Sequence, residues 1–269
     1  MLRPFKKLLA RAGFAARPDF LIIGAQKAGT TALHQILNQH SRVRGSITKE
    51  IHYFNNDEWC RPATRHEYAC CFPLSFQMRA GLKLFESTPS YLCHPEVPRR
   101  LRDYHPGLKL IILLRDPSER AFSAWTMYHH VFRTGVRQAL HDPRSFAEVV
   151  TEDLPEVDLR VYPQDSRWYF GRGLYQRQIE GFRKHFPDTQ LLILESAALR
   201  REFDRTTAAV QDFVGVPRES LRSVVANESA IDETAVYPAA IARLREFYHP
   251  HNEALRAYLG RELPSFHRP

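Results

Sequence analysis

The feature that most constrains the fold is an apolar run that leads directly into a glycine-containing loop and a helical pattern. Residues 20–23 (FLII) have strand length and no polar interruption, which is typical of a parallel strand covered on both faces. The loop Gly24–Thr31 follows, and Leu33, Ile36 and Leu37 then repeat with helical spacing. The sequence therefore predicts a buried strand whose carboxyl end leads into a helix N-terminus.

Further apolar runs alternate with helical patterns along the chain. The pattern predicts strands at 82–86, 108–114 and 190–194, and helices after 117 and over 174–186, 203–214 and 239–259. This alternation predicts an α/β fold with three α/β/α layers and a mainly parallel central sheet. With no repeat or low-complexity linker, we expect one domain over 19–269 after an N-terminal arm of residues 1–18. Residues 133–166, rich in charge and proline, predict a partly helical excursion over the active face.

Composition narrows the function classes without choosing among them. Hydrophobic residues make up 43% and charged residues 25% of 269, which excludes a wholly disordered or collagen-like chain. The net charge of +8 suits an anionic ligand, a nucleic acid or an acidic membrane surface. No run reaches the ~18–20 apolar residues of a membrane span. The basic, amphipathic N-terminal arm predicts a frayed or docked segment, with peripheral membrane contact as the alternative.

The four cysteines, Cys60, Cys70, Cys71 and Cys93, form no CxxC pair and no zinc-ligand spacing. Neighbouring Cys70 and Cys71 cannot readily bridge each other. We therefore expect reduced structural thiols and a cytoplasmic protein, with one disulfide as the open alternative.

The first loop has the composition of an anion site. Small residues let backbone N–H groups approach an anion, the helix dipole favours negative charge, and Lys27 adds a full positive charge. Lys27 precedes Gly29 by two residues, so the order is not that of a Walker A loop. A plain strand–turn–helix corner with an incidental lysine is the alternative. The residues expected at the anion are Gln26, Lys27, Ala28, Gly29, Thr30 and Thr31.

A second candidate phosphate site follows the strand at 108–114. Arg115 ends this strand, Pro117 suits the first turn of a helix, and Ser123 lies eight residues after Arg115. A guanidinium and a hydroxyl together suit a phosphate group.

These motifs resemble those of sulfotransferases that use 3′-phosphoadenosine 5′-phosphosulfate (PAPS). The segment Gly24–Thr31 resembles their 5′-phosphosulfate loop, and Arg115–Trp125 resembles their 3′-phosphate motif. Lys49–Phe54 and Phe85–Tyr91 are similar to the Lys-Glu-x-His-x-Phe and Glu-Lys-Thr-Pro-x-Tyr stretches of heparan sulfate N- and 3-O-sulfotransferases. The resemblance runs from about residue 20 to about residue 216. It implies PAPS as the sulfuryl donor and Tyr175 as a lining residue of the cofactor pocket.

Two departures from that family concern the acceptor and the donor. Family members that act on heparan carry lysine where this chain has Ser87. Their basic glycine loop near the C-terminus, flanked by two cysteines, has no counterpart between Ala226 and Ala242, where Lys, Arg, Gly and Cys are absent. These departures argue against heparan itself as the acceptor.

The implied reaction is an in-line displacement at sulfur, in which positioning and charge stabilisation dominate. We expect Lys27 to stabilise charge on the bridging oxygen, without a metal. By resemblance Glu50 takes the proton of the acceptor hydroxyl, with a pKa raised by partial burial. His52 is the rival base, and it shares a face with Glu50 if the stretch is extended. The alternative for Glu50 is a solvated carboxylate paired with Lys49.

The function expected is therefore sulfuryl transfer from PAPS to a hydroxyl of a saccharide, lipid or natural product. A P-loop-type nucleotide kinase is the alternative, although the Walker A order and a metal-binding acid are both missing. A nucleic-acid partner is not expected, because no recognisable nucleic-acid-binding signature appears.

Overall fold

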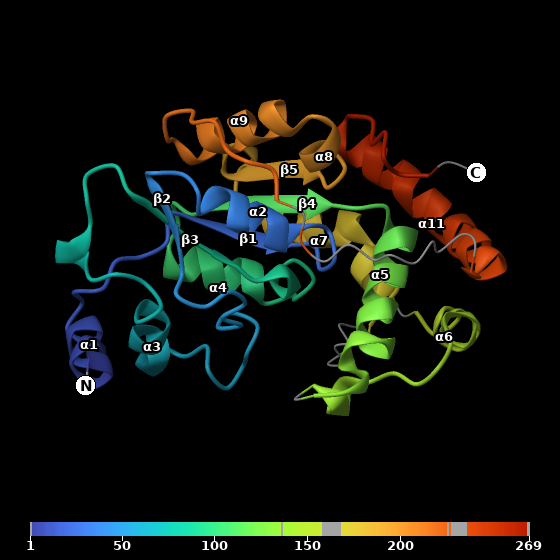
Figure 1. Cartoon of the computed structure of the whole chain (residues 1–269), viewed down its shortest axis with the longest axis horizontal. Helices are drawn as coiled ribbons and strands as arrows, with labels where there is room; N and C mark the ends of the chain where they lie inside the picture. Colours follow the sequence, from blue (N-terminus) through green and yellow to red (C-terminus); the bar gives the residue numbers. More distant parts are fainter. Residues whose placement is uncertain (1, 136, 158–167, 225, 227–235, 268–269) are drawn as a thin grey trace.

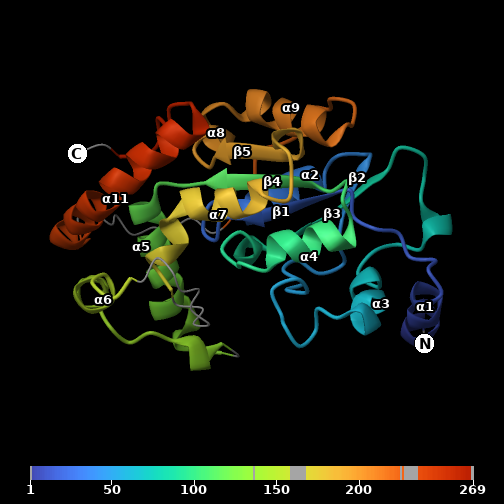
Figure 2. The same ribbon diagram turned by 180° about the vertical axis from the view of Figure 1, so that it is seen from behind.

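The protein is built on one five-stranded parallel sheet, seen from both sides in Figures 1 and 2. The computed structural model describes residues 2–135, 137–157, 168–224, 226 and 236–267. The strand order is β2-β3-β1-β4-β5, and each neighbouring pair is parallel. The strands are β1 (Phe20–Gly24), β2 (Val43–Gly45), β3 (Lys83–Ser87), β4 (Lys109–Leu114) and β5 (Leu191–Glu195).

Helices cover both faces of this sheet. Figure 1 shows α2 in front of the strands, Figure 2 shows α4 and α7 in front of the opposite face, and α8 and α9 lie beyond β5. The predicted three-layer α/β architecture is therefore confirmed. The helices are α1 (Leu2–Arg11), α2 (Thr30–Leu37), α3 (Arg65–Ala69), α4 (Val97–Tyr104), α5 (Pro117–His129), α6 (Phe146–Asp153), α7 (Tyr175–Arg183), α8 (Ala198–Arg201), α9 (Phe203–Val214) and α11 (Pro238–Leu259).

Two hydrophobic clusters hold these elements. The larger one contains β1 and β4, whose residues are almost all inaccessible to solvent, as expected for strands covered on both faces. The smaller one joins α5, α6 and α11 beyond the carboxyl end of β4. Trp125 and Tyr128 are buried in this second cluster. The second cluster thus holds α5 rigidly at the edge where β4 ends.

The four strands expected from apolar runs are present, and β2 is an additional one. Val43–Gly45 is only three residues long and lies at the sheet edge, so its sequence carries no apolar run. The helix expected over 174–186 is shorter, because α7 spans Tyr175–Arg183 and a 3₁₀ turn at Gly171–Gly173 precedes it. All four cysteines are free thiols.

The N-terminal arm is docked: α1 packs against α3 at the end of the molecule far from α5 and α11 (Figures 1 and 2). No helix of the described residues has both the length and the apolar character needed to cross a membrane. Within the excursion expected at 133–166, residues 146–153 form α6, which packs on α11. Residues 158–167 lie outside the described residues.

Candidate active site

The loop after β1 is shaped by two glycines. A Cβ on Gly24 would lie 2.4 Å from the Cβ of Leu92, so the strand can end here only without a side chain. Gly29, directly before α2, has φ +87°, a left-handed conformation that glycine adopts at little cost. As at every helix start, the first N–H groups of α2 lack intrahelical acceptors. The loop therefore directs these donors and the N-terminal end of the helix dipole outward from the carboxyl edge of the sheet.

Lys27 lies in this loop among other positive charges. Its side chain is half-buried, and its backbone is left-handed with φ +68°. Burial lowers the pKa of Lys27, and the nearby charge of Arg115 lowers it further, while Glu50 acts in the opposite direction. Arg120 and Lys49 add smaller effects that also lower this pKa. The site thus holds more positive charge than its own carboxylates neutralise.

The second motif forms a capped helix start at the end of β4. Asp116 caps α5 by accepting hydrogen bonds from the backbone N–H of Ser118 (2.9 Å) and Glu119 (3.2 Å). Arg115 Nε donates to Glu119 Oε2 at 3.1 Å, and its Nη1 donates to the carbonyl of Lys27 at 3.4 Å. Ser123 lies in the second turn of α5, and little of it is exposed. The guanidinium of Arg115 therefore joins the two motifs predicted to bind phosphate.

Three further side chains lie beside the contact between Arg115 and the Lys27 loop. The buried hydroxyl of Tyr175 donates to the carbonyl of Arg115 at 2.8 Å, so Tyr175 positions Arg115 rather than presenting a free hydroxyl. Gln26 Nε2 donates to the hydroxyl of Tyr128 at 3.5 Å, which ties the loop to α5. Arg120 is wholly buried; its Nη2 donates to the carbonyl of Tyr169, whereas Nε and Nη1 have no acceptor among the described residues.

The candidate base Glu50 lies in a tight ionic group. Lys49 Nζ donates to Glu50 Oε1 at 2.5 Å, and His52 Nε2 lies 3.7 Å from Glu50 Oε2. The other ring nitrogen of His52, Nδ1, is 3.2 Å from the hydroxyl of Ser90. The backbone N–H of Glu50 donates to the carbonyl of Ser87 at 3.0 Å, which anchors this segment at the carboxyl end of β3. Both expected base residues therefore lie at the same sheet edge as Lys27.

One expectation about Glu50 was wrong, and the condition of an extended stretch is not met. The stretch is not extended: Glu50 and His52 have φ +59° and +58°, and this left-handed backbone, rather than strand alternation, brings their side chains together. The pKa of Glu50 is also lowered rather than raised. Burial alone raises it, but the hydrogen bond to His52 and the charge and hydrogen bond of Lys49 outweigh burial and bring the pKa of Glu50 to about 2. Pairing with Lys49, weighed as the alternative, is what the structure shows.

A second carboxylate lies deeper in the same region and had no assigned role. Glu86, in β3, is completely buried, and burial raises its pKa to about 7 despite the nearby hydroxyls of Tyr91, Tyr68 and Thr88. The hydroxyl of Tyr91 accepts hydrogen bonds from the backbone N–H of Tyr53 (3.1 Å) and of Phe54. Glu86 and Tyr91 thus stand directly behind the turn that carries His52. The sequence signal was an acidic residue directly after the apolar pair Leu84 and Phe85 in a predicted strand.

Residues from distant parts of the chain also approach the two motifs. A Cβ on Gly29 would lie 3.4 Å from the hydroxyl of Ser196, at the end of β5. His267 donates its backbone N–H to Asp116 at 2.9 Å, and its ring Nε2 lies 3.2 Å from Glu119. No local pattern marks either residue. Most of the segment 226–242, where the family's basic loop has no counterpart, lies outside the described residues.

Among the described residues, no group of three or more histidine, cysteine, aspartate or glutamate side chains could hold a metal ion.

Comparison with known proteins identifies one family. A family model described as a sulfotransferase domain matches residues 17–234. The bifunctional heparan sulfate N-deacetylase/N-sulfotransferase 3 of Homo sapiens is 32% identical over 208 residues, which cover 74% of this chain and 22% of that protein. The heparan sulfate glucosamine 3-O-sulfotransferase 5 of Mus musculus is 25% identical over 268 residues, covering 91% of this chain and 73% of that protein.

Solved structures agree with this assignment. The crystal structure of a sulfotransferase from Alicyclobacillus acidocaldarius matches with a TM-score of 0.73 and 25% identity, covering 94% of this chain and 100% of that one. A sulfotransferase domain from the curacin biosynthetic pathway shares the fold, with a TM-score of 0.52 and 14% identity.

Proposed function

This chain belongs to the sulfotransferase domain family, and we propose that it transfers a sulfuryl group from PAPS to a hydroxyl group of a saccharide, lipid or natural product. The observation that carries the proposal is the contact between the two motifs, in which Arg115 Nη1 donates to the carbonyl of Lys27 at 3.4 Å. Two anion-binding elements in contact suit a donor with two phosphate groups. The known sulfotransferase fold supplies the reaction class.

The residues present fit such a donor. Among the described residues, Nε and Nη1 of the buried Arg120 have no acceptor, and the pKa of Lys27 is lowered by burial and by the charge of Arg115. A bound anion would therefore be attracted by cations that have capacity left for it. The loop N–H groups, Lys27 and the hydroxyls of Thr30 and Thr31 would hold the 5′ side. Arg115 and Ser123 would hold the 3′-phosphate.

The donor supplies an activated sulfur, and the residues of this chain supply charge and position. Lys27, partly desolvated, stabilises negative charge on the oxygen that leaves sulfur more effectively than a fully hydrated lysine could. Glu119 accepts from Nε of Arg115 and the carbonyl of Lys27 accepts from Nη1, so the donors on Nη2 remain for phosphate. Tyr175 fixes the backbone of Arg115, so this charge is oriented before the donor binds.

The acceptor proton goes to the Glu50–His52 group in this proposal, with Glu50 as the base. Glu50 is ionised throughout the physiological pH range, because its pKa is about 2. A low pKa also makes a weak base, so an acceptor that displaces Lys49 from Glu50 would strengthen the base as it binds. His52, held at Nδ1 by the hydroxyl of Ser90, orients the acceptor through Nε2.

Binding of the donor is tested by thermal unfolding with 3′,5′-adenosine bisphosphate, ATP with Mg²⁺, and an oligonucleotide. We expect stabilisation by the bisphosphate alone, because a ligand that binds only the folded state raises the unfolding temperature. A response to ATP with Mg²⁺ that equals or exceeds that of the bisphosphate would favour a nucleotide kinase. A response to the oligonucleotide alone would favour a nucleic-acid partner.

The reaction itself is tested by transfer of labelled sulfate from PAPS to panels of saccharide, lipid and natural-product hydroxyls. We expect transfer that survives chelation by EDTA. Loss of activity with EDTA that Mg²⁺ restores would contradict the expectation that Lys27 acts without a metal, and would favour a nucleotide kinase.

A further inference from the structure

The N-terminal helix α1 exposes its large apolar side chains to solvent instead of packing them on the domain. Phe5 and Leu8, one turn apart on α1, are 60% and 63% exposed. Ala10, about 200° from Leu8 around the helix, is buried, and Lys7 Nζ pairs with Glu67 of α3 at 2.7 Å. The helix therefore turns its small and basic side toward the protein and its large apolar side toward solvent.

Two more aromatic side chains are exposed at the same end of the molecule. Phe14 and Phe76 are 51% and 69% exposed, and the backbone N–H of Ser75 donates to the carbonyl of Phe14 at 2.7 Å. Figures 1 and 2 both place this end, with α1 and α3, far from α5 and α11. Four large apolar side chains thus protrude from one helix and the adjoining loops. Protruding apolar side chains of this kind suit a deformable interface better than they suit a closed groove on another protein.

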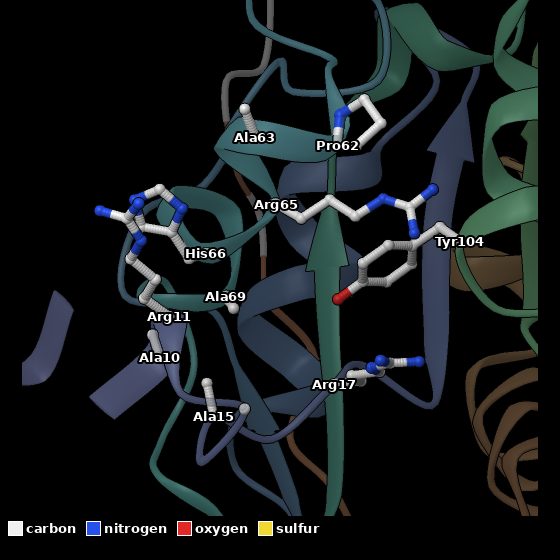
Figure 3. A pocket seen from close by; sticks show the side chains of 11 residues that line it. Ala10, Arg11, Ala15, Arg17, Pro62, Ala63, Arg65, His66, Ala69 and Tyr104 are labelled. Atoms are coloured by element: carbon white, nitrogen blue, oxygen red, sulfur yellow. The ribbon is translucent and has the colours of Figure 1, made fainter. Parts of the chain in front are cut away.

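A basic pocket lies at the same end of the molecule, on the side of α1 that carries Ala10. It has a volume of about 360 Å³ between α1 and α3, and no acidic residue lines it in the described part of the chain. Figure 3 shows the ring of Tyr104 between Arg65 and Arg17, with Arg11 and His66 on the opposite side. Among the described residues, the side chains of these three arginines have no hydrogen-bond or ion-pair partner, and Arg17 lies over the ring of Tyr104 at 5.6 Å from its centroid. Such a pocket can accept a phosphate group.

Protruding apolar side chains and arginines without ion-pair partners at the same end of the molecule match the chemistry of an anionic membrane surface. We propose that α1 and the adjoining loops dock on an anionic lipid bilayer, with Phe5 and Leu8 in the headgroup region and a lipid phosphate near Arg65. The first 17 residues contain five basic residues and no acidic one, so the whole segment is attracted to such a surface. This inference is independent of the reaction proposed above, because it uses none of its residues.

Sedimentation of the full chain with lipid vesicles tests the proposed role of the apolar side chains in docking. We expect binding to vesicles of equal parts phosphatidylcholine and phosphatidylglycerol, little binding to phosphatidylcholine alone, and weakening by salt. The double variant Phe5→Ser, Leu8→Ser should bind about tenfold more weakly, because apolar burial in the interface is lost. Val131→Ser, which changes an apolar residue that is 64% exposed at the α5 end, is the matched control and should bind normally.

The charged part is tested by neutralising two pocket arginines. Arg11→Gln with Arg65→Gln should lower the partition coefficient about 25-fold, since each basic side chain near an anionic membrane contributes a factor of about five. Arg205→Gln, at an exposed arginine on α9, is the matched control and should have no effect. All replaced side chains are exposed, so unchanged circular dichroism and thermal unfolding are expected for every variant.

Several results would overturn the proposal. Failure to bind anionic vesicles would do so, as would equal binding to phosphatidylcholine alone. Stabilisation by glycerol 3-phosphate that depends on Arg65, without vesicle binding, would instead assign the pocket to a free phosphate compound. A dimer that Phe5→Ser with Leu8→Ser converts to a monomer would assign the apolar face to a second copy. Binding to polyglutamate that does not depend on Phe5 would assign the basic side to an acidic protein.

Discussion

The carboxyl edge of the sheet and the α1–α3 end both gather positive charge, but they hold it in opposite ways. At the sheet edge, Arg115 is tied to Glu119 at 3.1 Å, and Lys27 lies half-buried beneath it. At the α1–α3 end, Arg11 and Arg65 are exposed, and their side chains have no partner in the described part of the chain. Buried charge on rigid elements is weakly screened, whereas exposed charge is strongly screened.

This difference in burial and pairing determines what kind of ligand each region can recognise. A preorganised, partly desolvated cation discriminates among anions by shape, because it cannot move to follow them. Exposed arginines beside protruding Phe5 and Leu8 can follow a surface that has charge but no fixed shape. If both proposals hold, the net charge of +8 serves two unlike purposes.

The largest effect should come from the base, which belongs to the sheet edge alone. Glu50→Gln should lower kcat about 10²–10⁴-fold, the usual contribution of a general base, with little change in affinity for adenosine bisphosphate. His52→Ala should cost less in kcat and raise the acceptor KM. Because the pKa of Glu50 is about 2 in the free enzyme, kcat/KM should stay flat on acidification to about pH 4.

An acidic limb of kcat/KM near neutrality that disappears in His52→Ala would instead identify His52 as the base. Normal kcat in Glu50→Gln would support the same reversal. Either result leaves the donor site untouched.

The next effect sharpens the contrast between arginines of the two regions. Arg115→Ala should weaken binding of adenosine bisphosphate by roughly 2–4 kcal/mol, through loss of a charge-assisted contact to phosphate. Arg65→Ala should leave this affinity unchanged, since Arg65 lies at the other end of the molecule. Calorimetry on both variants, after folding is verified, measures the difference. Equal weakening would show that net charge, not geometry, binds the donor.

A comparable effect concerns the stability of the sheet edge. The folded protein keeps the proton of Glu86 up to about pH 7, whereas an ordinary glutamate loses it near pH 4.5, so ionisation of Glu86 reduces stability as pH rises between these values. Glu86→Gln removes this loss. Relative to wild type, the free energy of unfolding of the variant, measured with urea, should rise by about 3 kcal/mol between pH 4 and pH 8. If the free energies of unfolding of variant and wild type changed with pH in parallel, Glu86 would have an ordinary pKa.

The smallest effect tests whether Ser123 in the second motif contacts the phosphate while Ser118 only caps the helix. Ser123→Ala should weaken binding of adenosine bisphosphate by about 1 kcal/mol, because a neutral donor is lost from an anion that keeps its other partners. Ser118→Ala, which removes a hydroxyl bonded to Asp116 instead, should leave the affinity unchanged if the helix stays folded. Calorimetry measures both. A larger loss in Ser118→Ala would show that the helix cap, not Ser123, orders the site.

The sequence by itself determined the fold class and the two phosphate motifs. A run of buried strand, glycine loop and helix is local, so its period and its glycines can be read directly. The same holds for Pro117, which starts α5 immediately after Arg115. The strand β2 could not be predicted, because three residues at a sheet edge gain their structure from the neighbouring strand β3.

Only the tertiary structure decided how these residues behave electrostatically and which way α1 faces. The pKa of Glu50 is low because Lys49 and His52 meet it through a left-handed turn, and the pKa of Glu86 is high because distant elements enclose it. The apolar side of α1 was visible in the sequence, but which side faces solvent was decided by the packing of α1 on α3, where Lys7 pairs with Glu67. Local patterns record what a backbone prefers, whereas burial and charge depend on residues that only folding brings together.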